Sequence, residues 1–332
     1  MATPVLAISI GGQDVSSKIN PRVLKGRVTR HDGDKADEME LTLSNYDGLL
    51  AKPRRGATLT IALGFHEFGG AVDRGAYIIQ DVTKSGGPAV FHVTGQSADL
   101  KKTLKTQKTR AWTAPKTLGD VLSEVASDNG LKAAVDGALA SIAIDKIIAQ
   151  TGESDMHLVT RLARRFDAVG KFAQGMLAFV PKGAGTTASG ASIAAVTITP
   201  EDCETFSVHD SDRSVRGKSH AKVWNRATAT STDVTGDAGD GGPDYGYPET
   251  FGSTAEATRA AAGRAKAFAR GKKTLSATLR PPVAVPVPGG VVTTQGFGDD
   301  DDASFIVKTV EDEFEGGENG GLTTKIEAEL KV

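Results

Sequence analysis

The sequence contains a single cysteine, Cys203, and this scarcity excludes both an intrachain disulfide and a cysteine-rich zinc site. Aromatic residues make up only 5% of the chain, so its hydrophobic cores must consist mainly of Val, Ile, Leu and Ala. No window approaches the ~18 consecutive apolar residues that a membrane-spanning helix needs. The first residues, MATPVLAISIGG, have neither the positive charge nor the apolar core of a signal peptide. These absences predict a protein made in the cytosol without stable membrane insertion.

An excess of charge of either sign is also missing. The 39 Lys and Arg residues face 41 Asp and Glu residues, which gives a net charge of −2 and a pI near 6.3. A dedicated nucleic-acid-binding protein usually carries a basic excess that displaces counterions from phosphates. With 39% hydrophobic and 24% charged residues, the composition is that of a globular protein, and 332 residues suffice for two or three domains. We therefore expect no sequence-specific binding of nucleic acid.

The chain lacks the short motifs of catalysis. It has no Walker A loop, no Gly-x-Gly-x-x-Gly that opens a helix, and no Gly-x-Ser-x-Gly nucleophile elbow. The histidines show no His-x-His or His-Glu-x-x-His spacing for a metal; they are His31, His66, His92, His157, His209 and His220. We accordingly assign no catalytic residue, no cofactor-binding residue and no metal ligand, and we expect no enzymatic activity. A triad dispersed along the chain would escape this search.

Two acidic stretches suggest calcium binding at first sight. HDGDKADEMEL has Asp37 and Leu43 where an EF-hand loop requires Gly at position six and Glu at position twelve. For GDDDDAS, which contains Asp299–Asp302, a solvated turn between strands is favoured over a metal site.

Residues 1–100 have the pattern of β structure. Short runs with partial period-two alternation, such as EMELTLSNYDG and ATLTIALGF, are separated by Gly, Asp and Asn turns. This spacing is typical of a sandwich or a barrel. It defines a first predicted domain.

The period changes at Thr117, which is the predicted N-cap of a helix over TLGDVLSEVASDNG. A second helix is predicted in GESDMHLVTRLARRFDA, residues 152–168, with Ser154 as N-cap and Asp155 favourably placed against the helix dipole. Its apolar arc spans nearly half the circumference, which suits a helix on a sheet. The strand-like GMLAFVPKG and the low-complexity GAGTTASGAS complete a mixed α/β domain over residues 101–192.

From residue 193 the β pattern returns in ASIAAVTITP, ETFSVHD and AKVWNRATATS, and TGDAGDGGPDYGYPETFG is predicted to be a long polar loop. A crossover helix is predicted in STAEATRAAAGRAKAFARGKK, which has an Ala-rich stripe. Strands follow in TLSATLR, FIVKTVEDEF and LTTKIEAELKV. Residues 193–332 are therefore predicted to form a second β domain.

Basic residues gather in three places. LKKTLKTQKTRAW is favoured as an exposed connector over a nucleic-acid arm. Arg264 falls near the apolar stripe of the crossover helix, so we expect it to pair with a buried or interfacial carboxylate. The third place is the polar arc of residues 152–168, with His157, Arg161, Arg164 and Arg165. A helix-turn-helix needs a turn of 3–4 residues, and more than twenty separate the first two predicted helices. We expect this arc to be solvated or pressed on a neighbouring subunit.

Several of these stretches together resemble the phage late control protein D family, the tail hub family. GQSADLKKTLKTQKTRAWTAPKTLGDVLSEVASDNGL is similar to its Gly-x-x-Ala-Asp-Leu strand end, Lys-rich stretch, Trp and Thr-Leu-Gly-Asp helix. GESDMHLVTRLARRFDA resembles its Glu-Ser-Asp segment and Arg-Leu-Ala helix, and the early and late β segments are similar to its opening and closing strands. Asp312 stands where many relatives have a His.

The resemblance implies an α+β fold of mostly antiparallel sheet, with β-barrel-like domains at 1–100 and 193–332 around the α/β insertion at 101–192. It also implies a homotrimer, related to the hub part of the type VI secretion spike protein (VgrG). Three chains would offer six barrels that join a sixfold tail tube to a threefold central spike, with a tape-measure protein as a further candidate partner. The implied location is the tail baseplate or tip of a virion assembled in the host bacterial cytoplasm.

Two other functions stay open at this point. One is a tail-associated cell-wall hydrolase, since hubs sometimes carry fused lytic domains, although no further domain remains once three are assigned. The other, less favoured, is a nucleic-acid-binding module. For Asp299–Asp302 the alternatives are an ion site, a plain turn, or a loop that faces a DNA-conducting lumen and repels the genome by like charge.

Overall fold

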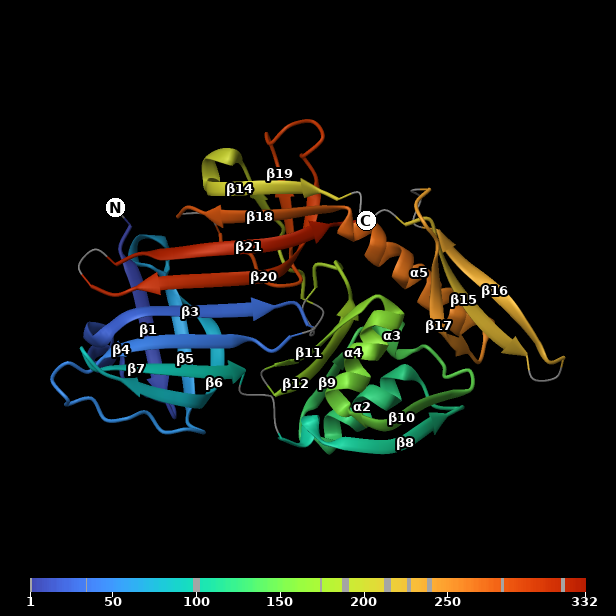
Figure 1. The fold of residues 1–332 in the computed structure, drawn as a ribbon, viewed down its shortest axis with the longest axis horizontal. Helices are drawn as coiled ribbons and strands as arrows, with labels where there is room; N and C mark the ends of the chain where they lie inside the picture. Colours follow the sequence, from blue (N-terminus) through green and yellow to red (C-terminus); the bar gives the residue numbers. More distant parts are fainter. Residues whose placement is uncertain are drawn as a thin grey trace.

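The computed structural model describes residues 2–33, 35–97, 102–173, 175–186, 191–211, 216–225, 228–237, 241–281, 284–317 and 320–332. Residues 98–101, which belong to the Gly-x-x-Ala-Asp-Leu strand end and the Lys-rich stretch, lie outside these residues, as do 187–190 and 238–240 of the two predicted loops. A large, mostly antiparallel sheet dominates the fold, and a smaller α/β unit and a sheet-and-helix arm stand beside it (Figure 1). This confirms the predicted α+β class. In the described part of the chain, no helix combines the length and apolarity needed to cross a membrane.

The N-terminal β unit folds from the predicted short strands. Its elements are β1 (Pro4–Ile10), β2 (Gln13–Asp14), α1 (Ser16–Ile19), η1 (Asn20–Arg22), β3 (Val23–His31), β4 (Glu38–Ser44), β5 (Thr58–Phe65), η2 (His66–Phe68), β6 (Gly70–Ser85) and β7 (Val90–Ser97). Alternate side chains of these strands, such as Leu41, Ile61 and Val93, are buried in one core. Phe314 and Leu322, from the C-terminal part of the chain, complete that core. The core of the N-terminal unit therefore needs residues from both ends of the chain.

A second β unit contains β13 (Val196–Ile198), η4 (Pro200–Asp202), β14 (Cys203–Asp210), β18 (Lys273–Leu279), β19 (Val291–Thr294), β20 (Ser304–Glu315) and β21 (Leu322–Leu330). Strand β20 pairs with β3 over seven residue pairs, from Thr309–His31 to Glu315–Lys25. The sheet therefore runs without interruption in the order β14-β18-β21-β20-β3-β4-β7-β6-β5-β1-β2, while β19 adds to β20 and β13 to β19. No closed barrel forms among the described strands; the two units expected as separate barrels share one open sheet.

The insertion between them contains η3 (Lys102–Lys105), β8 (Gln107–Thr113), α2 (Leu118–Asp128), β9 (Lys132–Val135), α3 (Gly137–Ala140), β10 (Ile147–Ser154), α4 (Asp155–Phe166), β11 (Ala168–Ala173) and β12 (Met176–Pro181). The predicted caps are confirmed, since the Thr117 side chain accepts from the Asp120 amide and Ser154 from the His157 amide. The basic stretch expected as a connector is instead strand β8 from Gln107 onward.

The remaining elements form an arm of β15 (Lys218–Asn225), β16 (Thr230–Asp237), β17 (Tyr245–Phe251) and α5 (Thr254–Gly271). The crossover helix is confirmed as α5, whose alanine stripe packs on the three-stranded sheet. The prediction of a loop over TGDAGDGGPDYGYPETFG is wrong in part, because Tyr245–Phe251 form strand β17, which pairs in parallel with β15. Tyr247 and Phe251 of β17 pack in the α5 core, a tertiary contact that overrides the Gly and Pro signals around them.

Charged residues fasten the insertion and α5 to the sheet. The buried guanidinium of Arg270, at the end of α5, pairs with Asp167 after α4 and with Glu329 of β21. Lys182, after β12, lies 2.9 Å from the same Glu329 carboxylate. Burial by itself would raise the pKa of Glu329, but the positive charge of Lys182 and its neighbours holds that pKa below its ordinary value. Lys171 of β11 adds a bond to the carbonyl of His31.

Asp312 is the buried carboxylate at the junction of the two β units. It is fully buried on β20, and its Oδ2 lies 2.9 Å from Nε of Arg74 and 3.2 Å from Nη2 of Arg30. Its Oδ1 accepts a 2.7 Å bond from the Thr324 hydroxyl. Arg30 and Arg74 come from β3 and β6, so one carboxylate joins the C-terminal strands to the N-terminal unit.

Replacing Asp312 by Ala should destabilise the protein by ~3–5 kcal/mol, because it leaves two buried guanidinium groups without their shared carboxylate. Equilibrium unfolding in urea measures this change. Glu313→Ala, next along β20 on the exposed side, is the matched control and should cost less than ~0.5 kcal/mol. Equal costs for the two variants would refute this role of Asp312.

Candidate interaction surface

One face of the large sheet is polar across both β units. Strand register places polar side chains in continuous rows that cross several strands. One row contains Ser207, Ser276, Glu327, Thr309 and His31. The next contains Thr205, Thr278, Lys325, Glu311, Thr29, Glu38 and Gln96. The opposite face packs into the two cores, so this polar sheet face is the side left for solvent or a partner.

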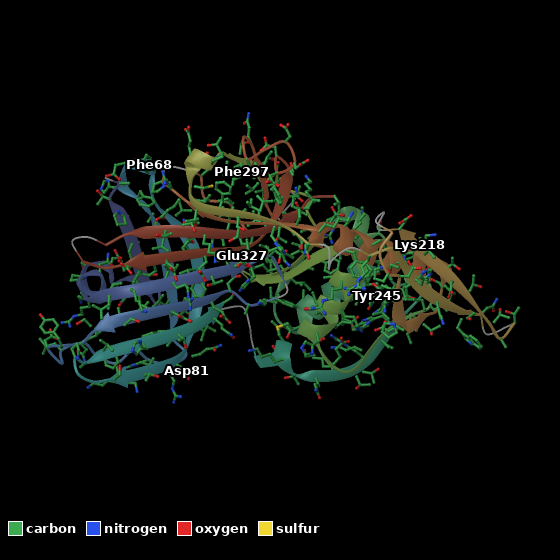
Figure 2. The ribbon with its side chains drawn as sticks, turned by 45° about the horizontal axis from the view of Figure 1, so that its top comes forward. Phe68, Asp81, Lys218, Tyr245, Phe297 and Glu327 are labelled. Carbon is green, nitrogen blue, oxygen red and sulfur yellow. The ribbon has the colours of Figure 1, made fainter. Side chains whose placement is uncertain are left out.

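Acidic groups outnumber basic ones on the polar sheet face. The carboxylates are Glu38, Glu40, Asp81, Glu311, Glu313, Glu315 and Glu327, and the cations in register with them are Lys25, Arg27 and Lys325. Arg27 pairs with Glu40 at 2.8 Å and approaches Glu311 at 3.8 Å. Glu327 and Asp81, labelled in Figure 2, form no ion pair with any described residue. The face therefore presents net negative charge.

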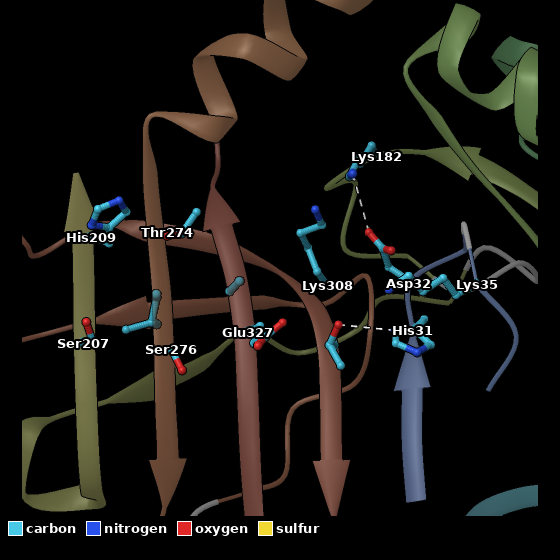
Figure 3. Close-up of a pocket in the computed structure, with 13 residues that line it drawn as sticks. His31, Asp32, Lys35, Lys182, Ser207, His209, Thr274, Ser276, Lys308 and Glu327 are labelled. Atoms are coloured by element: carbon cyan, nitrogen blue, oxygen red, sulfur yellow. Dashed lines mark hydrogen bonds and ion pairs between the residues drawn. The ribbon is translucent and has the colours of Figure 1, made fainter. Parts of the chain in front are cut away.

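A groove of about 430 Å³ lies at one end of this face. His209 of β14 and His31 of β3 stand on its two sides, with Lys308 between them (Figure 3). His31 Nδ1 lies 3.3 Å from the Thr309 hydroxyl, and burial lowers the pKa of its imidazole. No group of three or more His, Cys, Asp or Glu in the described part of the chain could hold a metal ion. The groove is a polar cleft that is lined by residues of the sheet and by Lys182 of the insertion.

The Glu-Ser-Asp motif at the start of α4 holds the elements of the insertion together. Asp155 is fully buried and accepts bonds from Lys108 at 2.7 Å, from Arg110 at 2.8 Å, and from Asn129 and Gln150. These partners come from β8, the C-cap of α2 and β10, so one carboxylate at the start of α4 ties four elements together. Burial alone would raise its pKa, but the bonds and the Arg110 charge lower it. The Lys-rich stretch thus serves the fold.

The arginine arc of α4 is engaged largely within the chain. Arg165 pairs with Glu249 of β17 and Glu256 of α5, and its guanidinium lies over the Phe251 ring. Arg161 pairs with Glu153 at 2.8 Å. The arc therefore docks the arm on the insertion.

Arg264 does not meet the carboxylate expected for it among the described residues. Its guanidinium instead lies 4.8 Å from the ring centre of Tyr245 and 4.7 Å from that of Phe268. Cation–π contact with two rings satisfies a charge near an apolar stripe.

The acidic run Asp299–Asp302 forms a turn between β19 and β20. Asp302 accepts bonds from the Gly296 and Phe297 amides, and Asp301 pairs with Lys273 at 3.2 Å. These contacts agree with the favoured turn and leave Asp299 and Asp300 exposed.

Comparisons of the sequence with known proteins identify a family and relatives. The sequence matches the family described as phage tail baseplate hub (GPD) over residues 34–318. It is 34% identical, over 200 residues that are 60% of this chain, to the "Probable baseplate hub protein" of Escherichia phage P2. The chain spans about half the length of the curated relatives it matches, 51% in the case of phage P2.

Solved structures share the fold at low sequence identity. A tail protein from Neisseria meningitidis MC58 superposes with a TM-score of 0.72 at 13% identity, covering 98% of this chain and 96% of that one. A component of the type VI secretion system from E. coli superposes with a TM-score of 0.59 at 12% identity, covering 98% of this chain and 77% of that one.

Replacing Asp155 by Asn should destabilise the protein by about 1.5–3 kcal/mol at pH 7, because four elements lose their shared charged acceptor. The folded pKa of Asp155 is lowered. Its stabilisation is therefore full above the unfolded pKa, near 3.9, and is lost as pH falls through the folded value.

Urea unfolding at pH 7 and at several values below pH 4 should thus show the gap between the wild type and Asp155→Asn closing in acid. Asp128→Asn, at the exposed rim of the same cluster, is the control and should cost less. A gap that stays constant with pH would contradict this assignment.

Proposed function

We propose that this chain is a structural hub whose three copies form a ring between a sixfold tail tube and a threefold central spike. The chain belongs to the phage tail baseplate hub (GPD) family, and the proposal starts from this membership. The ring would lie in the baseplate or tip of a virion tail, after assembly in the host cytoplasm. A tape-measure protein is a further candidate partner. The fold shared with a type VI secretion component supports a hub common to injection systems.

The observation that carries this proposal is the single sheet that joins two β units in one chain. If residues 1–100 and 193–332 act as two barrel-like domains around the insertion at 101–192, three chains supply six such units. Six units match a sixfold tube, and three insertions match a threefold spike. A permanent ring of this kind needs interfaces of ~2,000–5,000 Å².

The polar sheet face suits the inner wall of such a ring. A channel that conducts DNA must not hold its phosphates, and a surface with an acidic excess repels them. The face runs across both β units, so each chain would offer a continuous stretch of wall. In this proposal the carboxylates of the polar sheet face carry the like charge.

A second function, hydrolysis of the cell wall, has less support. Family members described as baseplate hubs are structural, and the carboxylates with strongly bonded partners, Asp155 and Asp312, are committed to the fold. A peptidoglycan zymogram tests this alternative, since clearing bands would favour the enzyme.

The purified chain should form a homotrimer with three times the mass of the 34.5 kDa chain in light scattering coupled to size-exclusion chromatography. Electron microscopy of the same sample should show a ring with the polar sheet face toward its axis. A species that stays monomeric at high concentration would contradict the trimer, and a ring with this face outside would contradict the channel wall.

A further inference from the structure

The loop between β4 and β5, residues 45–57, exposes large apolar side chains at its tip. Leu49 is 80% exposed and Tyr46 is 78% exposed, more than any other large hydrophobic residue in the described part of the chain. Exposed apolar groups of this size, gathered in one place, mark an interaction surface more often than chance. Lys52, Arg54 and Arg55 follow in the same loop and are also exposed.

This loop is held in one conformation. The buried Asn45 side chain accepts from the Leu50 amide, and Asp47 accepts from the Leu49 amide. Arg22 makes two parallel bonds to Asp47, at 2.7 and 2.8 Å. The hydrogen bond from Arg22 lowers the pKa of Asp47 to about 2. A loop fixed before binding loses little conformational entropy when it docks.

A second exposed apolar site lies on the other β unit. Phe206 of the edge strand β14 is 47% exposed and packs edge-to-face on Phe297, with ring centres 4.6 Å apart. Glu204, Asp299 and Asp300 are exposed in the same two segments. Among the described residues these three carboxylates form no ion pair, and neither do the three cations of the 45–57 loop.

The two sites lie on different β units, and four strands (β18, β21, β20 and β3) separate β14 from β4 in the sheet. Strand β14, with the β19–β20 turn beside it, ends the sheet on one side, whereas β4 and β7 lie beyond β3 on the other. Figure 1 shows the β4–β5 loop on the side of β6 and β7, away from β14. The two sites therefore cannot meet within one chain.

We propose that the 45–57 loop of one protomer docks on the Phe206–Phe297 site of a second copy of this chain. Tyr46 and Leu49 cover the two phenyl rings, while Lys52, Arg54 and Arg55 face Glu204, Asp299 and Asp300 of the neighbour. This inference rests on the proposed homotrimer and deepens it by naming the surfaces that meet.

Charge and symmetry select this pairing. Pairing of like sites would place three cations against three cations, or three carboxylates against three carboxylates, which is unfavourable. Pairing of unlike sites is favourable and heterologous, and an open oligomer keeps one free site of each kind, one at each end, until the ring closes. A contact of this type builds closed rings, as the proposed hub requires.

The test reverses the charge of one site and then restores complementarity. Arg54→Glu with Arg55→Glu should raise the dissociation constant of the trimer at least tenfold in sedimentation equilibrium at low salt. Adding Asp299→Lys and Asp300→Lys to the same chain should recover most of the loss. Lys105→Glu with Lys132→Glu, an equal change of charge on exposed residues of the insertion, is the control and should leave the trimer intact.

A cross-link locates the contact directly. Chains with Leu49→Cys and chains with Phe297→Cys, mixed during assembly, should join through a short bis-maleimide into dimers that contain one chain of each kind. Cys203 is buried, so the wild-type chain should give no such product.

The outcomes separate the two levels of the proposal. A wild-type chain that never forms trimers overturns the proposed ring and this contact with it. A stable trimer that ignores the charge reversal and yields no mixed cross-link overturns only the contact, and leaves the ring standing.

Discussion

The architecture depends on the pairing of β20 with β3. Without it the C-terminal strands would form a separate sheet, and the N-terminal core would lose Phe314 and Leu322. Asp312 reinforces this seam from the inside, because its carboxylate forms ion pairs with arginines of β3 and β6 and accepts a hydrogen bond from Thr324 of β21. A buried charge shared between two guanidinium groups tolerates few other partners, so it fixes the register of the seam as well as its existence.

The other parts of the molecule attach to this seam by the same physical means. Arg270 and Lys182 converge on Glu329 at the sheet, and Asp155 performs the corresponding role inside the insertion. In each case a buried or half-buried carboxylate pairs with cationic side chains from elements that lie far apart in the sequence. Aromatic residues are few in this chain, so its cores consist mainly of Val, Ile, Leu and Ala. Such cores fill space without specifying which surfaces meet. Paired charges supply that specificity.

Much of the local structure could be predicted from the sequence. Thr117 and Ser154 cap helices as their neighbours indicated, and period-two alternation located the strands of both β units. The errors have a common cause. Strand β17 was hidden by Gly and Pro that packing on α5 overrides, and Arg264 found aromatic rings in that same strand and helix. The polar sheet face had a signal in the sequence, the alternating glutamates of VEDEFE in β20. No local pattern reveals which side of the sheet these glutamates occupy.

The sequence by itself determined the periodicities, the caps, the absence of familiar catalytic motifs and the resemblance to tail hubs, because each of these depends on residues close together in the chain. Only the tertiary structure decided that two expected barrels are one open sheet. That decision depends on contacts such as Arg30 with Asp312, which lie 282 positions apart. The same long-range pairing aligned the polar rows of separate strands on one face, and it placed four strands between β14, which carries Phe206, and β4, which precedes the 45–57 loop. Strand order is a global property, and local sequence carries almost none of it.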